Sequence, residues 1–354
     1  MTTGLAEGLR HGSLWQRCSP VTRVRFRGVR VHVKRDDVFH LAGNKMRKLQ
    51  WFVAQDAAFF QAAHLVSFGG AQSNAMLAIA QLAHAKRVPF SYLSRLPAAA
   101  TTSSSGNLQL ALALGMRHVA LSPPEYAALA ASTTELAARG ARCCAAGERA
   151  VLIPQGAAFA QARDGLAQLA HELNAYVAAR GGQRFSVVVP CGTGTTALYL
   201  AQHLNDAAQL FAVPCVGDAA YLAQQFQDLV ERDAGLRAQR ATRTLTLPTI
   251  LAPRRKARFG RLAWPLVAMH RELLDATGIE FDLNYGAFAW HTMFDAEGDA
   301  LALLRGAGDG SSPPREVLYV HTGGVSGNAT MLERYLAKGK APPSLQSLLP
   351  GSRL

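Results

Sequence analysis

The feature that most constrains the fold is the alternation of strand-like and helix-like segments from Ala63 onward. Short β-branched and aromatic runs are followed by alanine- and leucine-rich segments, a pattern that builds right-handed βαβ units around a mostly parallel sheet. The expected strands cover residues 64–68, 90–94, 118–121, 150–153, 185–189, 210–216 and 317–321, and the expected helices cover 49–60, 72–85, 106–114, 125–139 and 197–204. The sequence therefore predicts an α/β protein with two open, mostly parallel twisted sheets flanked by helices.

The composition is that of a globular protein with a large core. A chain of 354 residues, 49% hydrophobic and 17% charged, suits one large domain or two of ordinary size. No apolar run approaches the roughly 20 residues of a membrane-spanning helix. The segment from Met1 to Arg10 contains Glu7 and lacks the apolar core of a secretion signal. We therefore expect a cytoplasmic protein with no membrane partner.

The cysteines and the charge suggest no metal and no specific nucleic-acid partner. The five cysteines show neither CxxC nor zinc-ligand spacing, so neither a disulfide scaffold nor a structural metal is expected. A net charge of +13 can mark a nucleic-acid-binding protein, but the excess arginine is scattered along this chain. The densest basic patch, residues 254–261, contains a single aromatic residue, Phe259, and no nucleic-acid-binding motif. A solvated surface loop is the simpler interpretation.

The segment from Pro190 to Thr196 is typical of a phosphate-binding turn. It joins the expected strand 185–189 to the expected helix 197–204 through Gly192-Thr193-Gly194-Thr195-Thr196. Glycines let the backbone approach a ligand closely, and backbone N–H groups and threonine hydroxyls supply donors for an anion. The segment lacks a Walker lysine and a complete GxGxxG motif, so a purely structural turn is the alternative.

A second segment, Gly43 to Lys48, supplies a candidate amine. Lys45 is followed by Arg47 and Lys48 just before an expected helix. Like-charged neighbours and partial burial lower the pKa of a lysine, which makes its neutral amine a usable nucleophile and base. The alternative is a solvated, basic helix start.

Five motifs in order give the chain a family resemblance. The motifs are Lys34-Arg35-Asp36-Asp37, Gly43 to Leu49, Gly69-Gly70-Ala71-Gln72-Ser73-Asn74, Gly192 to Thr196, and His321-Thr322-Gly323-Gly324. With these motifs the chain resembles the 1-aminocyclopropane-1-carboxylate deaminase/D-cysteine desulfhydrase family of pyridoxal-phosphate enzymes, which have the fold of the tryptophan synthase β-subunit. The resemblance runs from about Arg25 to about Tyr335. It implies a small α/β domain, residues 49–155, inserted into a large cofactor-binding domain made of residues 1–48 and 156–354, and a homodimer or higher oligomer.

The resemblance also implies roles for individual residues. Lys45 would bind pyridoxal 5'-phosphate covalently and move protons at the carbon of a small amino-acid substrate, with the cofactor as electron sink. Tyr285 and Ser73 are the other candidate catalytic residues, and Gln72, Ser73 and Tyr285 would contact the substrate. The remaining cofactor ligands would be Asn74 at the ring hydroxyl, Thr322 at the ring nitrogen, and Lys48 with Gly192, Thr193, Gly194, Thr195 and Thr196 at the phosphate.

Departures from the family pattern bear on the substrate. In the deaminases that open the cyclopropane ring, a glutamate follows the tyrosine and an apolar residue precedes the paired glycines, whereas this chain has Gly286 and Thr322. The resemblance therefore favours α,β-elimination of the D-cysteine desulfhydrase type, giving pyruvate and ammonia. Ring opening to 2-oxobutyrate and ammonia remains an alternative, as does racemisation or dehydration of serine. Ala75 and Ala157, where the family carries polar residues, leave open a catalytically weak cofactor-binding homologue.

Overall fold

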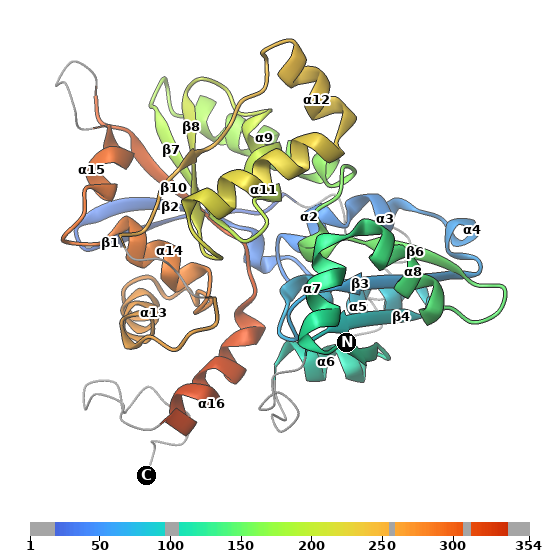
Figure 1. Ribbon diagram of the computed structural model, residues 1–354. Coiled ribbons are helices and arrows are strands. Elements are labelled where there is room, and N and C mark those ends of the chain that lie inside the picture. The colour runs from blue at the N-terminus through green and yellow to red at the C-terminus, as the bar shows by residue number, and fades with distance from the viewer. Residues whose placement is uncertain (1–17, 96–105, 255–258, 307–312, 339–354) are drawn as a thin grey trace. The chain divides into compact units, whose positions relative to one another are not determined.

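The computed structural model describes residues 18–95, 106–254, 259–306 and 313–338 (Figure 1). The chain divides into two compact units. Among the described residues, the smaller unit comprises His40–Ala162, and the larger unit comprises Cys18–Phe39 together with the chain from Arg163 onward. The domain boundaries inferred from the resemblance stay a prediction. Half of the basic patch, residues 255–258, lies outside the described residues.

The larger unit contains a six-stranded sheet with the order β1-β2-β10-β7-β8-β9 (Figure 1). Its strands are β1 (Val21–Phe26), β2 (Val29–Arg35), β7 (Phe185–Cys191), β8 (Ala208–Pro214), β9 (Thr249–Ile250) and β10 (Glu316–His321). β1 and β2 form an antiparallel hairpin, and its two turn residues, Arg27 and Gly28, both have positive φ, as tight hairpin turns require. All other neighbouring strands are parallel.

The helices of the larger unit pack a core rich in aromatic residues against this sheet. The helical segments are η2 (Asp36–Val38), α9 (Ala162–Ala178), α10 (Thr195–Ala201), α11 (Ala219–Arg232), α12 (Ala234–Ala241), α13 (Trp264–Thr277), α14 (Gly286–Met293), α15 (Ala300–Arg305), η5 (Val325–Gly327) and α16 (Asn328–Lys338). Trp290 is fully buried and contacts Phe26, Phe281 and Tyr319, with ring centroids 5.3–5.4 Å apart. Burial of these rings supplies much of the hydrophobic stabilisation.

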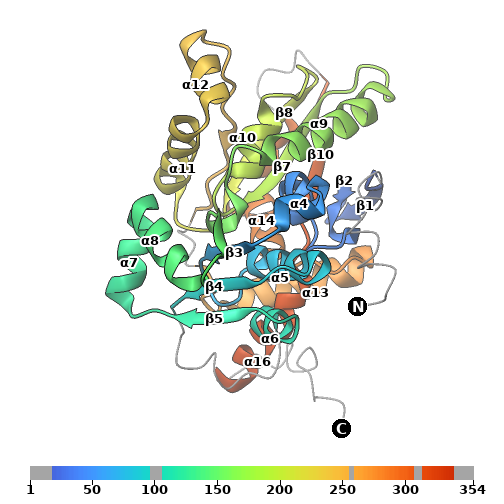
Figure 2. The ribbon, with the colours of Figure 1, turned by 90° about the vertical axis from the view of Figure 1, so that its right-hand side faces the viewer.

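The smaller unit contains a four-stranded parallel sheet with the order β5-β4-β3-β6. Its strands are β3 (Ala63–Phe68), β4 (Phe90–Ser94), β5 (Arg117–Ala120) and β6 (Arg149–Ile153), and its helical segments are α2 (Lys45–Lys48), α3 (Gln50–Ala54), α4 (Ala57–Phe60), α5 (Asn74–Lys86), α6 (Asn107–Ala113), α7 (Pro123–Ala131), α8 (Thr133–Cys143) and η4 (Gln155–Ala157). Figure 2 shows α7 and α8 on one face of the sheet and α5 on the other. Both faces are thus covered, as parallel sheets require.

The predicted α/β class and both sheets are confirmed. All seven expected strands are present, with ends that differ by up to two residues. Among the described residues, no helix is both long and apolar enough to cross a lipid bilayer.

Two predicted helices are wrong in extent. The segment 125–139 forms two helices, because Ser132 is extended and its Oγ accepts a hydrogen bond from the Glu135 N–H at 3.2 Å, which starts α8. The segment 49–60 forms α3 and α4, because Gln55 is extended and Asp56 caps a new helix by accepting from the Phe59 N–H. Local capping interrupts a helical pattern that apolar periodicity alone makes continuous.

The Lys34-Arg35-Asp36-Asp37 motif is tied to the larger unit by ionic contacts. The amine of Lys34, which is 1% exposed, lies 2.6 Å from the Glu172 carboxylate of α9 and also donates to the Ser19 carbonyl. Arg35 forms a two-point ion pair with Asp37 at 2.8 and 2.7 Å. In this structure the motif therefore links the end of β2 to its neighbours.

We predict that the Lys34–Glu172 pair contributes little net stability, whereas removing only one of its two partners strongly destabilises the protein. Lys34→Met or Glu172→Leu alone should lower the free energy of unfolding by about 3–5 kcal/mol, because each leaves a buried charge without its partner. The double variant should recover most of that loss. Denaturant unfolding of the four proteins measures the coupling, and additive losses would contradict the prediction.

Candidate functional site

Lys45 follows a backbone segment in an unusual conformation. Leu41, Ala42 and Gly43 have φ values of 56°, 52° and 72°, and Asn44 then stands at the N-cap position of the short helix α2 without a side-chain capping hydrogen bond. Residues with a Cβ pay about 1–2 kcal/mol each in this left-handed region, so the surrounding fold must hold them there. The half-buried Lys45 amine donates to Asn44 Oδ1 at 3.0 Å. The candidate amine is therefore held by its neighbour on a constrained turn.

Lys48 is almost fully buried at the other end of α2. Its amine donates to the carbonyl of Gly156 in η4 at 3.1 Å. Both α2 and η4 pack against α5. The smaller unit therefore brings the lysine segment, the η4 turn and the helix that follows the Gly69–Asn74 motif into one neighbourhood.

The predicted substrate-binding residues Gln72 and Ser73 and the predicted cofactor ligand Asn74 lie where β3 passes into α5. Ser73 is the N-cap of α5, and its Oγ accepts from the backbone N–H groups of Ala75 and Met76 at 3.2 and 3.4 Å. A helix start after a parallel strand is a favourable place for an anion, because its backbone N–H groups point outward and the helix dipole is positive there. This geometry suits a carboxylate.

Asn107, which was not predicted from the sequence, holds the Gln72-Ser73-Asn74 segment in place through hydrogen bonds. It is fully buried; its backbone N–H donates to Gln72 Oε1 at 2.8 Å, and its side-chain amide donates to the Gln72 carbonyl and to Asn74 Oδ1 at 3.0 and 2.7 Å. The amide orientations of Gln72 and Asn74 are thereby set. Asn107 lies more than 30 positions away with no motif around it, so no local signal in the sequence could have identified it.

Tyr92 of β4 packs beneath the same loop. Its buried hydroxyl donates to the Gly70 carbonyl at 3.2 Å and interacts with the Ser73 side chain. Burial raises the pKa of Tyr92, with the Ser73 hydrogen bond opposing the shift in part. The phenol therefore stays protonated and acts as a fixed donor.

The glycine-threonine segment of the larger unit forms a tight turn between β7 and α10. Gly194 is the N-cap, with a φ of 68°, and a Cβ there would come within 2.5 Å of the Phe226 ring. The hydroxyls of Thr193 and Thr195 are 2.9 Å apart, and Thr195 is fully buried. The turn can hold a phosphoryl group with its backbone N–H groups and hydroxyls, as expected from the sequence.

The structure brings Tyr285 to this turn. A Cβ added to Gly192 would lie 3.0 Å from the Tyr285 hydroxyl, so the phenol sits directly against the backbone of the turn. Burial raises the pKa of Tyr285, and the Cys215 thiol and Asp282 carboxyl add to the shift. On its other side the ring packs against Phe259, with centroids 5.2 Å apart.

Asp282, also missed by the sequence analysis, positions Tyr285. Its buried carboxylate accepts from the backbone N–H groups of Asn284, Tyr285 and Gly286 at 3.1, 2.7 and 2.9 Å. Burial raises the pKa of Asp282, and these hydrogen bonds oppose the shift. Because these three N–H groups lie at the start of α14, the carboxylate fixes the backbone from which the Tyr285 side chain projects.

Thr322 lies half-buried beyond the end of β10, and His321 orders the turn that carries it. His321 Nε2 donates to the Glu280 carbonyl at 2.8 Å, while Nδ1 accepts from the Gly323 N–H at 3.2 Å. The ring also stacks on Phe281 at 4.5 Å. These contacts need a neutral imidazole. In agreement, burial lowers the pKa of His321, although the Asp37 carboxylate opposes the shift.

The larger unit therefore gathers the Gly192 turn, Tyr285 and the Thr322 turn, and the smaller unit gathers Lys45, Lys48 and the Gln72-Ser73-Asn74 segment. The lysine amine can bond an aldehyde and the turn can bind a phosphate, so each unit carries one element expected of a cofactor site. That the two act on one ligand stays a prediction.

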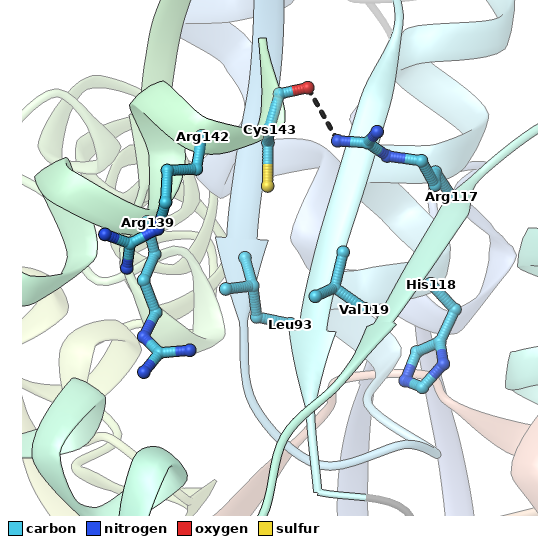
Figure 3. A pocket seen from close by; sticks show the side chains of 7 residues that line it. All are labelled: Leu93, Arg117, His118, Val119, Arg139, Arg142 and Cys143. Atoms are coloured by element: carbon cyan, nitrogen blue, oxygen red, sulfur yellow. Dashed lines mark hydrogen bonds between the residues drawn. The ribbon is translucent and has the colours of Figure 1, made fainter.

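A cavity of about 320 Å³ in the smaller unit involves none of the predicted residues. Figure 3 shows arginines facing it from two sides. It is lined by Leu93, Arg117, His118, Val119, Arg139, Arg142 and Cys143. Arg139 is paired with Glu125 and Glu135, and Arg117 donates to the Cys143 carbonyl at 2.6 Å. Since these cations already have partners within the protein, we assign the cavity no role.

Comparison with solved structures identifies the fold. A structure described as an ACC deaminase homologue superposes with a TM-score of 0.71 at 21% identity, covering 95% of this chain and 99% of that one. The O-acetylserine-dependent cystathionine β-synthase of Helicobacter pylori gives 0.59 at 14% identity, with 96% and 98% covered. An O-ureido-L-serine synthase gives 0.59 at 17% identity, with 100% and 98% covered. No protein-family model matches the sequence. The predicted tryptophan synthase β-subunit-like fold is thereby confirmed.

We predict that His321 makes stability depend on pH. Because its pKa in the folded protein lies below the ordinary value of about 6.5, the unfolded chain takes up the proton first as the pH falls. Stability should therefore be unaffected by this group above about pH 7 and fall below about pH 6.5, by up to about 1.4 kcal/mol per pH unit. His321→Gln, which keeps one donor and one acceptor, should lose less. The same pH dependence of the free energy of unfolding in the wild type and in His321→Gln, measured by denaturant unfolding, would contradict this prediction.

Proposed function

We propose that this protein is a pyridoxal-phosphate-dependent enzyme that catalyses α,β-elimination on a small amino acid, with D-cysteine as the type substrate. The five ordered motifs support the cofactor, and so does the fold shared with the ACC deaminase homologue over nearly the whole chain. The products would be pyruvate, ammonia and, from D-cysteine, hydrogen sulfide, with one water consumed.

Pyridoxal phosphate, when bound, would supply an electron sink for negative charge at the substrate α-carbon. Lys45 would hold it through its amine, and Lys48 with the Gly192–Thr196 turn would bind its phosphate. Asn74 would contact the ring hydroxyl and Thr322 the ring nitrogen. A neutral hydroxyl at Thr322 would leave that nitrogen unprotonated and temper the sink, which favours elimination over transamination.

The substrate would be oriented by the start of α5. Ser73 and Gln72 would hold its carboxylate at the positive end of the helix dipole, and Asn107 would keep Gln72 in place through its two hydrogen bonds. The released Lys45 amine would then take the α-proton. Because Lys45 lies on a constrained turn, little conformational entropy is lost when its amine approaches the α-proton.

The observation that carries the proposal of elimination is the contact of the Tyr285 hydroxyl with the Gly192 turn. The raised pKa keeps the Tyr285 phenol protonated at neutral pH, so its hydroxyl can donate a hydrogen bond to a leaving group. Tyr285 would hydrogen-bond the sulfur as the carbon–sulfur bond breaks. The bonding pair would leave with sulfur as thiolate, which takes up a proton from solvent. Asp282 would act as its positioning residue.

Ring opening of a cyclopropane amino acid is the second candidate, favoured by the likeness to the ACC deaminase homologue. Gly286 argues against it. A Cβ at Gly286 would lie 2.8 Å from Phe281 Cβ and 3.2 Å from Asp282 Oδ2. A glutamate here would need the backbone to shift and would bring a second carboxylate beside Asp282. The pattern that ring-opening deaminases carry therefore does not fit this backbone.

We predict that Lys45 is the covalent attachment point. Cofactor-loaded protein should show a visible absorption band that is lost in Lys45→Ala, because the proposal assigns the covalent bond to the Lys45 amine. Borohydride reduction followed by peptide mass analysis should find the adduct on Lys45. Lys338→Ala, at an exposed position in α16, is the matched control and should keep the band. A colourless loaded wild type, or an adduct on another lysine, would count against the proposal.

We predict that D-cysteine yields pyruvate, ammonia and sulfide in equal amounts, and that 1-aminocyclopropane-1-carboxylate yields no 2-oxobutyrate. Tyr285→Phe should lower turnover by about 10²–10³-fold while the visible band remains, because the hydrogen bond to the leaving group is lost although the cofactor stays bound. A panel including D- and L-serine tests the other outcomes. Formation of 2-oxobutyrate would favour ring opening. Interconversion of the serines would favour racemisation, and a bound cofactor with no turnover would favour the catalytically weak homologue.

A further inference from the structure

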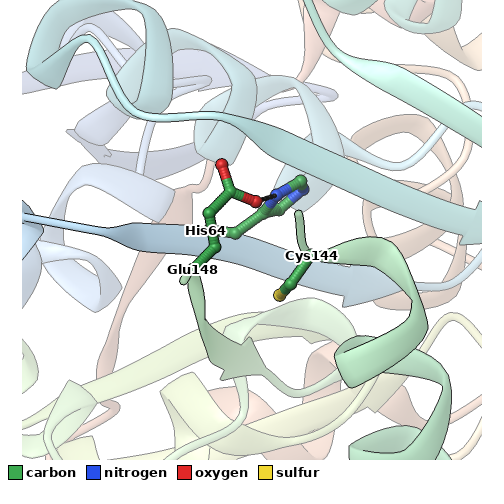
Figure 4. Close-up of side chains that lie close together, drawn as sticks. All are labelled: His64, Cys144 and Glu148. Atoms are coloured by element: carbon green, nitrogen blue, oxygen red, sulfur yellow. Dashed lines mark hydrogen bonds and ion pairs between the residues drawn. The ribbon is translucent and has the colours of Figure 1, made fainter. Parts of the chain in front are cut away.

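Three side chains with metal-binding atoms meet at the amino end of the smaller sheet. They are His64 near the start of β3, Cys144 just after α8, and Glu148 just before β6, and their ligand atoms all lie within 4.8 Å of one another (Figure 4). His64 is buried, whereas Cys144 and Glu148 are half-buried. The group is brought together by the parallel pairing of β3 with β6, in which His64 lies opposite Ala150.

The imidazole of His64 is oriented on both sides. Its Nδ1 lies 2.8 Å from Glu148 Oε2, and its Nε2 lies 2.8 Å from the fully buried Ser91 hydroxyl. Ser91 Oγ also accepts from Arg117 Nε at 3.0 Å. A serine hydroxyl has two lone pairs and one proton, so Ser91 can serve His64 in either tautomer. Such an outer contact is what fixes a histidine ligand at a metal site.

We propose that His64 Nδ1, Cys144 Sγ and the Glu148 carboxylate bind one Zn²⁺ ion. Nitrogen, thiolate and carboxylate ligands together suit zinc better than calcium or magnesium, which bind oxygen. Zinc–ligand distances of about 2.0–2.3 Å imply ligand separations of about 3.5 Å in a tetrahedron. His64 Nδ1 and Glu148 Oε2, now 2.8 Å apart, would move apart by about 0.7 Å to admit the ion, and any separation as long as the 4.8 Å limit would close by about 1.3 Å. Water would be the fourth ligand on the half-exposed side.

The charges and protons balance at this site. With zinc on Nδ1, His64 would carry its proton on Nε2, and this N–H would donate a hydrogen bond to the Ser91 hydroxyl. The Cys144 thiol would release its proton to solvent. One thiolate and one carboxylate then neutralise the two charges of the ion. Burial, Glu148 and Cys143 raise the pKa of Cys144, while Arg117 lowers it. Without metal the thiol therefore keeps its proton, and this proton competes with zinc for the sulfur.

The proposed ion would brace the loop between α8 and β6. His64 lies near the first residue of β3, whereas the Gly69–Asn74 motif follows its last residue, so the two features lie at opposite ends of one strand. A role in stability rather than in chemistry follows. The inference does not rest on the proposed enzyme activity, and it differs from the expectation of no structural metal because the ligands come from separate elements.

The full-length protein is first stripped of metal with a chelator and dialysed, and zinc is then added back. We expect elemental analysis of the reloaded protein to find one tightly bound ion per chain, and we expect a higher melting temperature with zinc than without it. Ser91→Ala should weaken zinc binding by about 10–100-fold, because it frees the imidazole. Cys144→Ser should weaken it further. Cys18→Ser, which changes an exposed cysteine in the larger unit, is the matched control and should bind zinc as the wild type does.

The melting temperatures of the metal-free variants show whether each one folds. Folded Cys144→Ser that still binds zinc as tightly as the wild type would overturn the proposal. No retained ion and no thermal shift in the wild type would overturn it as well. If Cys144→Ser does not fold, His64→Gln serves in its place and should lose the ion in the same way.

Discussion

The larger unit depends on one pairing: β10, from late in the sequence, lies between β2 and β7 and is parallel to both. Parallel strands end at the same edge of a sheet, so this pairing brings together the segments that follow these strands. These are the turn at Asp37, the turn at Thr322 and the Gly192 turn. The His321 ring, whose Nε2 lies 3.9 Å from Asp37, and the Phe281-Asp282 segment then complete the edge. Tyr285 reaches Gly192 because this arrangement holds its neighbours in place.

Parallel pairing has the same effect in the smaller unit. The Gly69–Asn74 segment follows the central strand β3, with Tyr92 of β4 and Gln155 after β6 on either side. Its polar side chains are held by the buried Asn107, whose amide donates to the Gln72 carbonyl and to Asn74 Oδ1. Each unit thus fixes its polar residues at strand ends with buried hydrogen bonds, which is how a fold pre-organises a binding surface.

The sequence predicted the alternating core of the fold because buried parallel strands are continuous apolar runs that local composition reveals. It did not predict where β10 inserts, since strand order depends on contacts between distant residues. The β1–β2 hairpin has a local signal in the sequence, the dipeptide Arg27-Gly28 between two alternating runs. The motif residues could be named from the sequence. Asn107 and Asp282 could not be found in that way, because their hydrogen bonds to the motif exist only after folding.

The central position of β10 also sets the order in which the chain can be completed. All four strands of the smaller sheet have been synthesised by Ile153, so that sheet can pair early on the ribosome. In the larger sheet β2 and β7 must wait for residues 316–321 of a 354-residue chain. Until then both strands present unpaired edges, and a nascent chain halted before Glu316 carries two open templates for wrong association.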